Sequence, residues 1–137
     1  MSYLIDTCVL SELRRSQANA NVVAWVNARP RQSLYLSVLS LGEIRKGIEG
    51  VSDPEFRQSL LDWLQVQLPD YFSGRVLGID ASIADRWGRV QADAGRTLPV
   101  IVALLAATAL CYDLTLVTRN VKDFAGLGVP LVNPWDE

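Results

Sequence analysis

The sequence predicts an α/β fold of three layers, α/β/α, with a central parallel sheet of four to five strands. Two observations predict it. Short apolar segments alternate with amphipathic helical segments along the whole chain, and a helical connection between successive strands is what parallel pairing requires. The 137 residues, half of them hydrophobic, can supply one such domain with its own core. We therefore expect residues 1–137 to form a single domain.

The expected strands are short and mostly apolar, as buried strands of a parallel sheet are. The first, at residues 2–5, is followed at once by Asp6. The others are expected at residues 34–37, 75–79 and 114–118, with an edge strand at residues 130–132.

The expected helices begin and end at residues typical of helix boundaries. Asp53 and Pro54 open one helix, with proline in the first turn. Its apolar residues recur every four positions, at Phe56, Leu60, Leu64 and Leu68. Asp80 caps the next helix, and Pro99 opens an apolar helix that runs to Cys111. Further helices are expected at about residues 10–15, 22–26 and 39–49.

The absence of histidine excludes several kinds of site. Ser-His-Asp triads, histidine acid–base catalysis and histidine-bound zinc all require that residue. The two cysteines, Cys8 and Cys111, lack the spacing of metal ligands, and we expect free thiols in a cytosolic protein. A catalytic metal site would therefore consist of oxygen ligands, which favours Mg²⁺ or Mn²⁺.

The charge balance limits how the chain can meet nucleic acid. Its net charge is −2, whereas residues 1–50 carry six Lys and Arg against four Asp and Glu. Domains that bind nucleic acid by charge alone are usually strongly basic, so an RNA contact must be local or bridged by metal ions. The longest apolar segment, at residues 100–111, is too short to span a membrane. We expect a cytoplasmic protein with no targeting segment.

Polar residues follow three of the expected strands. Asp6 ends the first strand, Glu43 lies just beyond the second, and residues 118–120, Thr-Arg-Asn, end the fourth. The carboxyl ends of parallel strands share one edge of the sheet. Two carboxylates 4 Å apart repel by about 4 kcal/mol at an effective dielectric near 20. A divalent cation relieves this repulsion, and can activate water and stabilise a phosphodiester transition state.

Each of these residues also has a purely structural interpretation. Asp6 can cap the helix that follows it, residues 40–43 match a capping box with Glu43 at its third position, and residues 120–123 can cap a short turn. Nearby cations can contact phosphate or belong to solvated helix faces, and Arg45 with Glu49 is an ordinary i,i+4 pair. The basic residues near these points are Arg14, Arg15, Arg45, Lys46, Arg119 and Lys122. The four tryptophans favour core or dimer contacts over base stacking.

Several motifs, in order and without large gaps, resemble the VapC toxins, whose fold is the PIN domain. Residues 3–12, Y-L-I-D-T-C-V-L-S-E, resemble the usual opening L-D-T-N-V-L-S-E. The segment L-G-E-I-R-K-G, residues 41–47, looks like the second motif. L-L-A-A-T-A at residues 104–109, L-V-T-R-N-V-K-D-F at residues 116–124 and N-P-W at residues 133–135 complete the pattern.

The resemblance implies a PIN-like domain over residues 1–137 and an endoribonuclease that depends on Mg²⁺ or Mn²⁺. It implies the toxin half of a type II toxin–antitoxin pair, usually a homodimer, inhibited by a VapB-type antitoxin through which the pair binds operator DNA. Carried over by position, Asp6 and Glu43 are catalytic and metal-binding acids. Asn120 stands at a catalytic position that is Asp or Asn in the family. Thr7 and Thr118 support the site.

Two positions depart from the family pattern. The third metal-binding acid of the family stands in P-V-I-D, where this chain has Val102, and Cys8 stands where asparagine is usual. Valine cannot bind a metal ion, so we expect strongly reduced nuclease activity. The alternative is a catalytically inactive PIN-fold protein that binds the antitoxin and co-regulates the operon. A third class, a phosphoacceptor receiver with Asp80 as acceptor, lacks the motif around Glu43 and the Thr-Arg-Asn element.

Overall fold

A five-stranded parallel sheet forms the centre of the computed structural model, which describes residues 1–136. The strands follow the spatial order β3-β2-β1-β4-β5, and each neighbouring pair is parallel. Each lies within its predicted range, which confirms the predicted sheet. The strands are β1 (Tyr3–Ile5), β2 (Leu34–Ser37), β3 (Val76–Leu77), β4 (Thr115–Val117) and β5 (Leu131–Val132).

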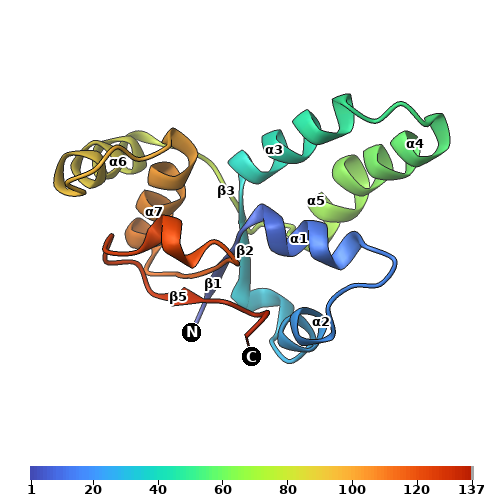
Figure 1. Cartoon of the computed structure of the whole chain (residues 1–137), viewed down its shortest axis with the longest axis horizontal. Helices are drawn as coiled ribbons and strands as arrows, with labels where there is room; N and C mark the ends of the chain where they lie inside the picture. The colour runs from blue at the N-terminus through green and yellow to red at the C-terminus, as the bar shows by residue number, and fades with distance from the viewer. Residues whose placement is uncertain (137) are drawn as a thin grey trace.

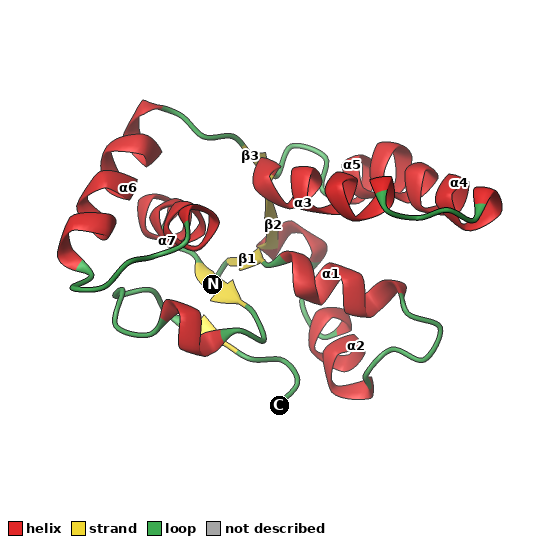
Figure 2. Cartoon of the chain, turned by 45° about the horizontal axis from the view of Figure 1, so that its top comes forward, coloured by secondary structure: helices red, strands yellow, loops and turns green. Residues whose placement is uncertain are grey.

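Helices cover both faces of this sheet, which confirms the three-layer fold (Figure 1). Two helices, α6 and α7, pack against each other on one face, and α1 to α5 lie on the other (Figure 2). The helices are α1 (Thr7–Arg14), α2 (Ala20–Asn27), α3 (Val38–Glu49), α4 (Pro54–Asp62), α5 (Leu68–Tyr71), α6 (Ala81–Asp93) and α7 (Val100–Tyr112). Shorter segments are the 3₁₀ turns η1 (Arg31–Ser33) and η3 (Val121–Phe124), and the π turn η2 (Trp63–Gln67).

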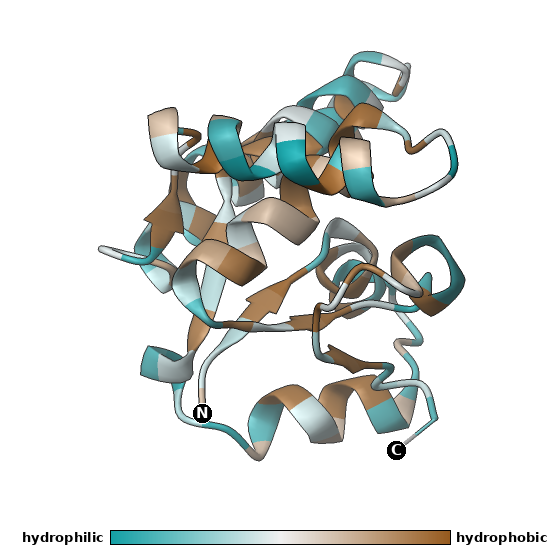
Figure 3. Cartoon of the chain, turned by 90° about the vertical axis from the view of Figure 1, so that its left-hand side faces the viewer, coloured by the Kyte–Doolittle hydropathy of each residue, from teal (hydrophilic) through white to brown (hydrophobic). Residues whose placement is uncertain are grey.

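Two hydrophobic cores lie on the two faces of the sheet. Side chains of a strand alternate between faces, so Tyr3 and Ile5 enter the core under α1 to α5 while Leu4 enters the core under α6 and α7. Figure 3 shows the resulting apolar character of the central strands. The tryptophans contribute to these cores, Trp25, Trp63 and Trp135 to the first and Trp87 to the second, as predicted for core residues.

The helix predicted from Asp53 through Leu68 is interrupted by the π turn η2. A spacing of four residues exceeds the 3.6 residues of an α-helical turn, so an apolar stripe with that spacing drifts around a regular helix. The wider π turn takes up extra chain and offsets part of the drift. Leu64 and Leu68 are buried, whereas Phe56, predicted in the same stripe, is 53 % exposed. That part of the prediction is wrong.

The apolar segment at residues 100–111 forms α7, which packs between the sheet and α6. Its buried residues are mostly alanines, which allow close packing against its neighbours. Within residues 1–136, no helix has both the length and the apolar character needed to cross a membrane.

Candidate active site

The strand order places one crevice at the carboxyl end of the sheet. The chain extends the sheet from β1 towards β3, and then returns to add β4 and β5 on the other side of β1. Ligands of open α/β sheets bind where the order reverses in this way. Asp6 follows β1 and Thr118 follows β4 at this point, and the Asp6 backbone N–H donates to the Val117 carbonyl at 3.0 Å.

Asp6 is a buried carboxylate whose two oxygens both accept hydrogen bonds. Oδ1 accepts from the Thr7 backbone N–H at 2.8 Å, so Asp6 does cap α1, as one interpretation of the sequence held. Oδ2 accepts from the Thr118 hydroxyl at 2.7 Å. The same hydroxyl oxygen accepts from the Asn120 backbone N–H at 3.0 Å. Thr118 therefore fixes both the carboxylate and the segment that carries Asn120.

Thr7 connects Asp6 to the carboxylate of Glu43. The Thr7 hydroxyl lies 2.7 Å from Glu43 Oε1 and 2.9 Å from the Ser40 hydroxyl oxygen. A threonine hydroxyl has one proton and a carboxylate can only accept, so Thr7 donates to Glu43 and its oxygen is left to accept from Ser40. Thr7, predicted to support the site, thus contacts the predicted site acid Glu43 directly.

The predicted capping box at residues 40–43 is wrong. The N-cap of α3 is Ser37, whose hydroxyl oxygen accepts from the Leu39 backbone N–H at 3.1 Å. Because α3 begins at Val38, directly after β2, Ser40 is buried inside the helix and meets Thr7. Glu43 thus stands in the second turn, where its carboxylate is free to face Thr7 rather than its own helix terminus.

Cys8 adds a thiol beside the same carboxylate. Its S–H donates to Asp6 Oδ2 at 3.7 Å, and its sulfur lies 3.7 Å from the Thr118 hydroxyl. Burial, and next the negative charge of Asp6, raise the pKa of this thiol above its ordinary value. Cys8 is therefore neutral at physiological pH and adds no negative charge to the site.

The residues predicted for the site line one cleft of about 450 Å³. The cleft is bordered by Asp6, Thr7, Glu43 and Asn120. Thr118 does not line the cleft, but its hydroxyl donates to the Asp6 carboxylate. The full lining is Asp6, Thr7, Cys8, Ser11, Glu43, Pro99, Ile101, Val102, Leu105, Asn120, Asp123 and Phe124. The proposed side-chain cap by Asn120 does not form, since its side chain makes no capping bond at the start of η3.

Asp123 also lines the cleft, and sequence reasoning did not include it among the site residues. A 3₁₀ turn has three residues per turn, and η3 therefore brings Asp123 to the same side as Asn120. The spacing of these two polar residues after β4 was the signal that could have found it. Arg96 holds this turn in place by donating to the Asp123 carbonyl at 3.0 Å.

Val102 forms part of the opposite wall of the cleft, in the first turn of α7. This helix has no acidic residue in its first turn and no side-chain cap, although a helix N-terminus favours negative charge. Among residues 1–136, no three Asp, Glu, Cys or His side chains lie together so as to hold a metal ion. The oxygen donors present, Asp6 and Glu43, fit one ion that keeps most of its water.

The other basic and acidic residues singled out in the sequence lie outside the cleft. Arg45 pairs with Glu49 at 3.4 Å, as predicted for an i,i+4 pair. The Arg119 guanidinium lies 5.1 Å from the centre of the Trp135 ring. Asp80 caps α6 by accepting from the Ile83 N–H at 2.9 Å, so it has the structural role predicted for it.

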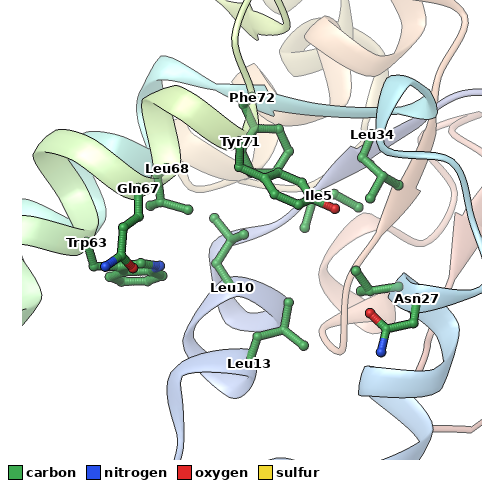
Figure 4. Close-up of a pocket in the computed structure, with 11 residues that line it drawn as sticks. Ile5, Leu10, Leu13, Asn27, Leu34, Trp63, Gln67, Leu68, Tyr71 and Phe72 are labelled. Atoms are coloured by element: carbon green, nitrogen blue, oxygen red, sulfur yellow. The ribbon is translucent and has the colours of Figure 1, made fainter.

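A second cavity, of about 300 Å³, lies between α1, α2, η2 and α5 (Figure 4). Its lining is mainly apolar, with Asn27 and Gln67 as its only amide side chains, and it contains no carboxylate. It therefore lacks carboxylates that could hold a metal ion, and the cleft at Asp6 remains the candidate active site.

The fold and the cleft together define a parallel α/β domain with acidic residues at the switch point of its sheet, and comparison with known families gives the particular class. The chain belongs to the PIN domain family, whose model matches residues 3–128. This assignment replaces the receiver alternative.

Known proteins similar to this chain include a plasmid stability protein, a toxin and a ribonuclease. The plasmid stability protein StbB of Pseudomonas syringae pv. tomato is 33 % identical over 97 % of this chain and 98 % of its own length. The toxin FitB of Neisseria gonorrhoeae is 31 % identical over 98 % and 99 %. The VapC ribonuclease Y4jK of Sinorhizobium fredii is 28 % identical over 97 % of each chain.

Solved structures of similar proteins share the whole fold. The FitAcB crystal structure from Neisseria gonorrhoeae superposes with a TM-score of 0.91 at 30 % identity, over 98 % of this chain and 99 % of the other. A structure of FitAB bound to a DNA fragment superposes with a TM-score of 0.89 at 29 % identity, over 97 % and 95 %.

Proposed function

We propose that this protein is the toxin of a toxin–antitoxin pair, a VapC-like endoribonuclease whose activity is attenuated by Val102. The observation that carries the proposal is the hydrogen-bonded group of Asp6, Thr7 and Glu43, which borders one cleft at the switch point of the sheet. The ribonuclease name of a relative aligned over nearly its whole length supports the reaction class.

The catalytic role falls to the oxygen ligands of the cleft. Asp6 and Glu43 would hold Mg²⁺ or Mn²⁺, with Asn120 and Asp123 on the neighbouring wall to orient water or phosphate. A bound divalent ion supplies an activated water and charge stabilisation at the phosphodiester. Thr118 and Thr7 hold the two carboxylates in place, so the protein reorganises little when the ion binds.

Val102 limits this chemistry because it puts an aliphatic side chain where a third carboxylate would complete the ligand set. Two carboxylates suffice for one largely hydrated Mg²⁺, but hardly for a pair of ions about 3.5–4 Å apart. We therefore expect weak metal binding and slow cleavage. The same observation favours a second candidate, an inactive PIN-fold protein retained for antitoxin binding and regulation of its operon.

The expected partners are a VapB-type antitoxin, operator DNA reached through that antitoxin, and a second copy of this chain in a homodimer. Similarity to the FitAcB structure and to the structure of FitAB bound to a DNA fragment supports a protein partner and a DNA-bound complex. We expect the pair to act in the cytoplasm, where its RNA substrate is found, and residues 1–137 to fold as one domain.

The test is to measure RNA cleavage in Mg²⁺ or Mn²⁺ by the unaltered protein, which has Val102, and by its Val102→Asp variant. We expect Val102→Asp to cut RNA and the protein as written to cut slowly or not at all. Glu43→Gln in the Val102→Asp background should abolish cleavage, which guards against a contaminating nuclease. Equal cleavage with Val102 or Asp at this position would contradict the assigned metal site. No cleavage by either protein would favour the regulatory alternative.

A further inference from the structure

A groove of about 600 Å³ between α1 and α4 continues from the candidate active site. Ser11 borders both the acidic cleft and this groove, so the two hollows meet along α1. The groove is lined by Ser11, Arg14, Arg15, Ser16, Phe56, Ser59, Leu60 and Trp63. A linear ligand that leaves the cleft past Ser11 would enter this groove.

One face of α1 forms the floor of this path. Thr7, Ser11 and Arg14 follow the i, i+4, i+7 spacing that places side chains on the same side of a helix. At a rise of about 1.5 Å per residue, Arg14 lies roughly 10 Å along the helix axis from Thr7. The path thus begins at hydroxyl and carboxylate groups and ends at a guanidinium.

The facing side of the groove carries two aromatic rings. Phe56, Ser59 and Trp63 follow the i, i+3, i+7 spacing of one helix face on α4 and the start of η2. Phe56 is 53 % exposed, although burial of a phenylalanine side chain is worth about 1.5–3 kcal/mol. An exposed ring beside an arginine is a surface on which a nucleic-acid base can stack.

Of the two arginines that line the groove, Arg14 has no carboxylate partner among the described residues. Its Nη2 donates to the Ser59 hydroxyl at 2.6 Å, and its guanidinium lies 5.6 Å from the centre of the Trp63 ring. Its Nε is buried without a hydrogen-bond partner, and no ion pair involves Arg14 within the described residues 1–136. Arg15, by contrast, pairs with Glu12 at 3.1 Å. Arg14 therefore presents a fixed positive charge that no carboxylate neutralises.

We propose that the groove between α1 and α4 binds the single-stranded RNA that leads away from the cleft, with a phosphate at Arg14 and a base stacked on Phe56. This inference rests on the proposed ribonuclease function and names how its substrate is held. The acidic cleft repels phosphate and the chain as a whole is negative, so a substrate strand needs a local cation. An uncompensated arginine between aromatic rings suits a polyanion whose bases have π faces.

The test measures binding apart from cleavage. The full chain, purified without antitoxin, is titrated into a fluorescent single-stranded RNA decamer in EDTA, and anisotropy is followed at several salt concentrations. Phe56→Ala should weaken binding about five- to a hundredfold, the range for loss of one stacked base. Arg14→Gln should weaken binding and lower the slope of log K against log salt by about one, whereas Arg14→Lys should keep the slope.

Matched variants outside the groove serve as controls. Val66→Ala removes a 64 % exposed apolar side chain from η2, and Arg86→Gln removes a half-buried arginine from α6. Both should bind RNA like the protein as written, and thermal unfolding should show that all variants fold.

Unchanged RNA affinity in Phe56→Ala and Arg14→Gln would overturn the proposal. So would variants that keep RNA affinity but lose antitoxin, because the groove would then be a protein-binding surface. Loss of RNA binding in the groove variants supports the proposed RNA groove. Failure of Val102→Asp to cut RNA would count only against the proposed nuclease function. If Val102→Asp cuts RNA but the groove variants bind RNA with unchanged affinity, the proposed RNA groove is refuted and the proposed nuclease function is not.

Discussion

The two walls of the acidic cleft differ in chemistry although they border the same space. On one wall, Asp6 and Glu43 are held by hydroxyl and backbone donors at 2.7–2.8 Å. On the other wall, the first two turns of α7 present Ile101, Val102 and Leu105. The carboxylates of the hydrogen-bonded wall are held by donors of the protein itself. The apolar wall offers no such group, so the polar contacts of the cleft are confined to one side.

The difference also changes the electrostatics of the cleft. A third carboxylate on α7 would add a repulsion of the order of 4 kcal/mol against each acid at 4 Å. It would recover only about 0.3–1 kcal/mol from the N-terminus of α7. Without an ion, the valine form is therefore the more stable one. With an ion, the carboxylate form gains more from binding.

We expect the largest effect, a change in Mg²⁺ affinity, from Val102→Asp, which places a carboxylate on the apolar wall. Because second-sphere changes alone alter metal affinity by about 10- to 100-fold, a direct ligand in Val102→Asp should raise Mg²⁺ affinity by about a hundredfold or more. The variant should melt at a lower temperature than the protein as written in EDTA, and gain more from added Mg²⁺, since a ligand bound only to the folded state stabilises it. Differential scanning fluorimetry over a Mg²⁺ titration measures both.

The control for this prediction is an aspartate on the same helix but outside the cleft. Val100 is 56 % exposed and does not line the cleft. Val100→Asp should leave the response to Mg²⁺ as it is in the protein as written. An equal response in Val100→Asp and Val102→Asp would mean that the two walls do not share a metal site.

Removing the Thr118 hydroxyl, which donates to Asp6, should lower the free energy of unfolding. Thr118→Val keeps the volume but removes the donor to Asp6 and the acceptor of the Asn120 N–H. Leaving buried polar groups without partners should lower the free energy of unfolding by about 1–3 kcal/mol. Urea denaturation measures this loss. Thr115→Val, on the strand that precedes Thr118, is the matched control, because within the described residues no hydrogen bond of the buried Thr115 side chain is present.

Removing the Thr7 hydroxyl should lower the free energy of unfolding by less than removing the Thr118 hydroxyl. Thr7→Val loses the hydroxyl contacts to Glu43 and Ser40 at the border of the cleft, where water can replace part of them. We expect a loss of about 0.5–1.5 kcal/mol, the usual net value of a hydrogen bond. In urea denaturation, a loss as large as that of Thr118→Val would indicate that Thr7, not Thr118, is the principal support of the polar wall.

Glu12 should give the smallest effect and one that depends on pH. Its carboxylate accepts from the Asn19 backbone N–H at 2.9 Å and pairs with Arg15, which together hold α1 to the start of α2. The Asn19 N–H first, and the Arg15 and Arg119 charges next, lower the pKa of Glu12. A lowered pKa stabilises the fold above the unfolded value, roughly 4.3, and this stabilisation is lost as the pH falls through the folded pKa.

Glu12→Gln should therefore melt at a lower temperature than the protein as written at pH 7. The gap should begin to close below about pH 4.3 and disappear once Glu12 is protonated in the folded protein. Thermal melts from pH 7 to the most acidic pH at which both proteins fold measure the gap. A gap that widens on acidification would contradict the assigned contacts, because those contacts need the charged carboxylate.

The sequence alone determined the elements and much of the site. Short apolar segments separated by helical ones were enough to place all five strands of a parallel sheet within their predicted ranges. Asp6 and Glu43 were predicted because polar residues directly after parallel strands must meet at one edge. Val102 was recognised as a departure because its neighbours match a family motif.

Only the tertiary structure decided how these residues are held and which others join them. Ser40 and Glu43 fit a capping box by local spacing, but the short link after β2 made Ser37 the cap and turned Ser40 towards Thr7. Asp123 lies in the cleft because η3 is a 3₁₀ turn, and the spacing from Asn120 to Asp123 alone does not distinguish this turn from a loop. The physical reason is common to both. A sequence pattern reports which side of its own helix or strand a residue faces, whereas hydrogen-bond partners depend on how separate elements pack together.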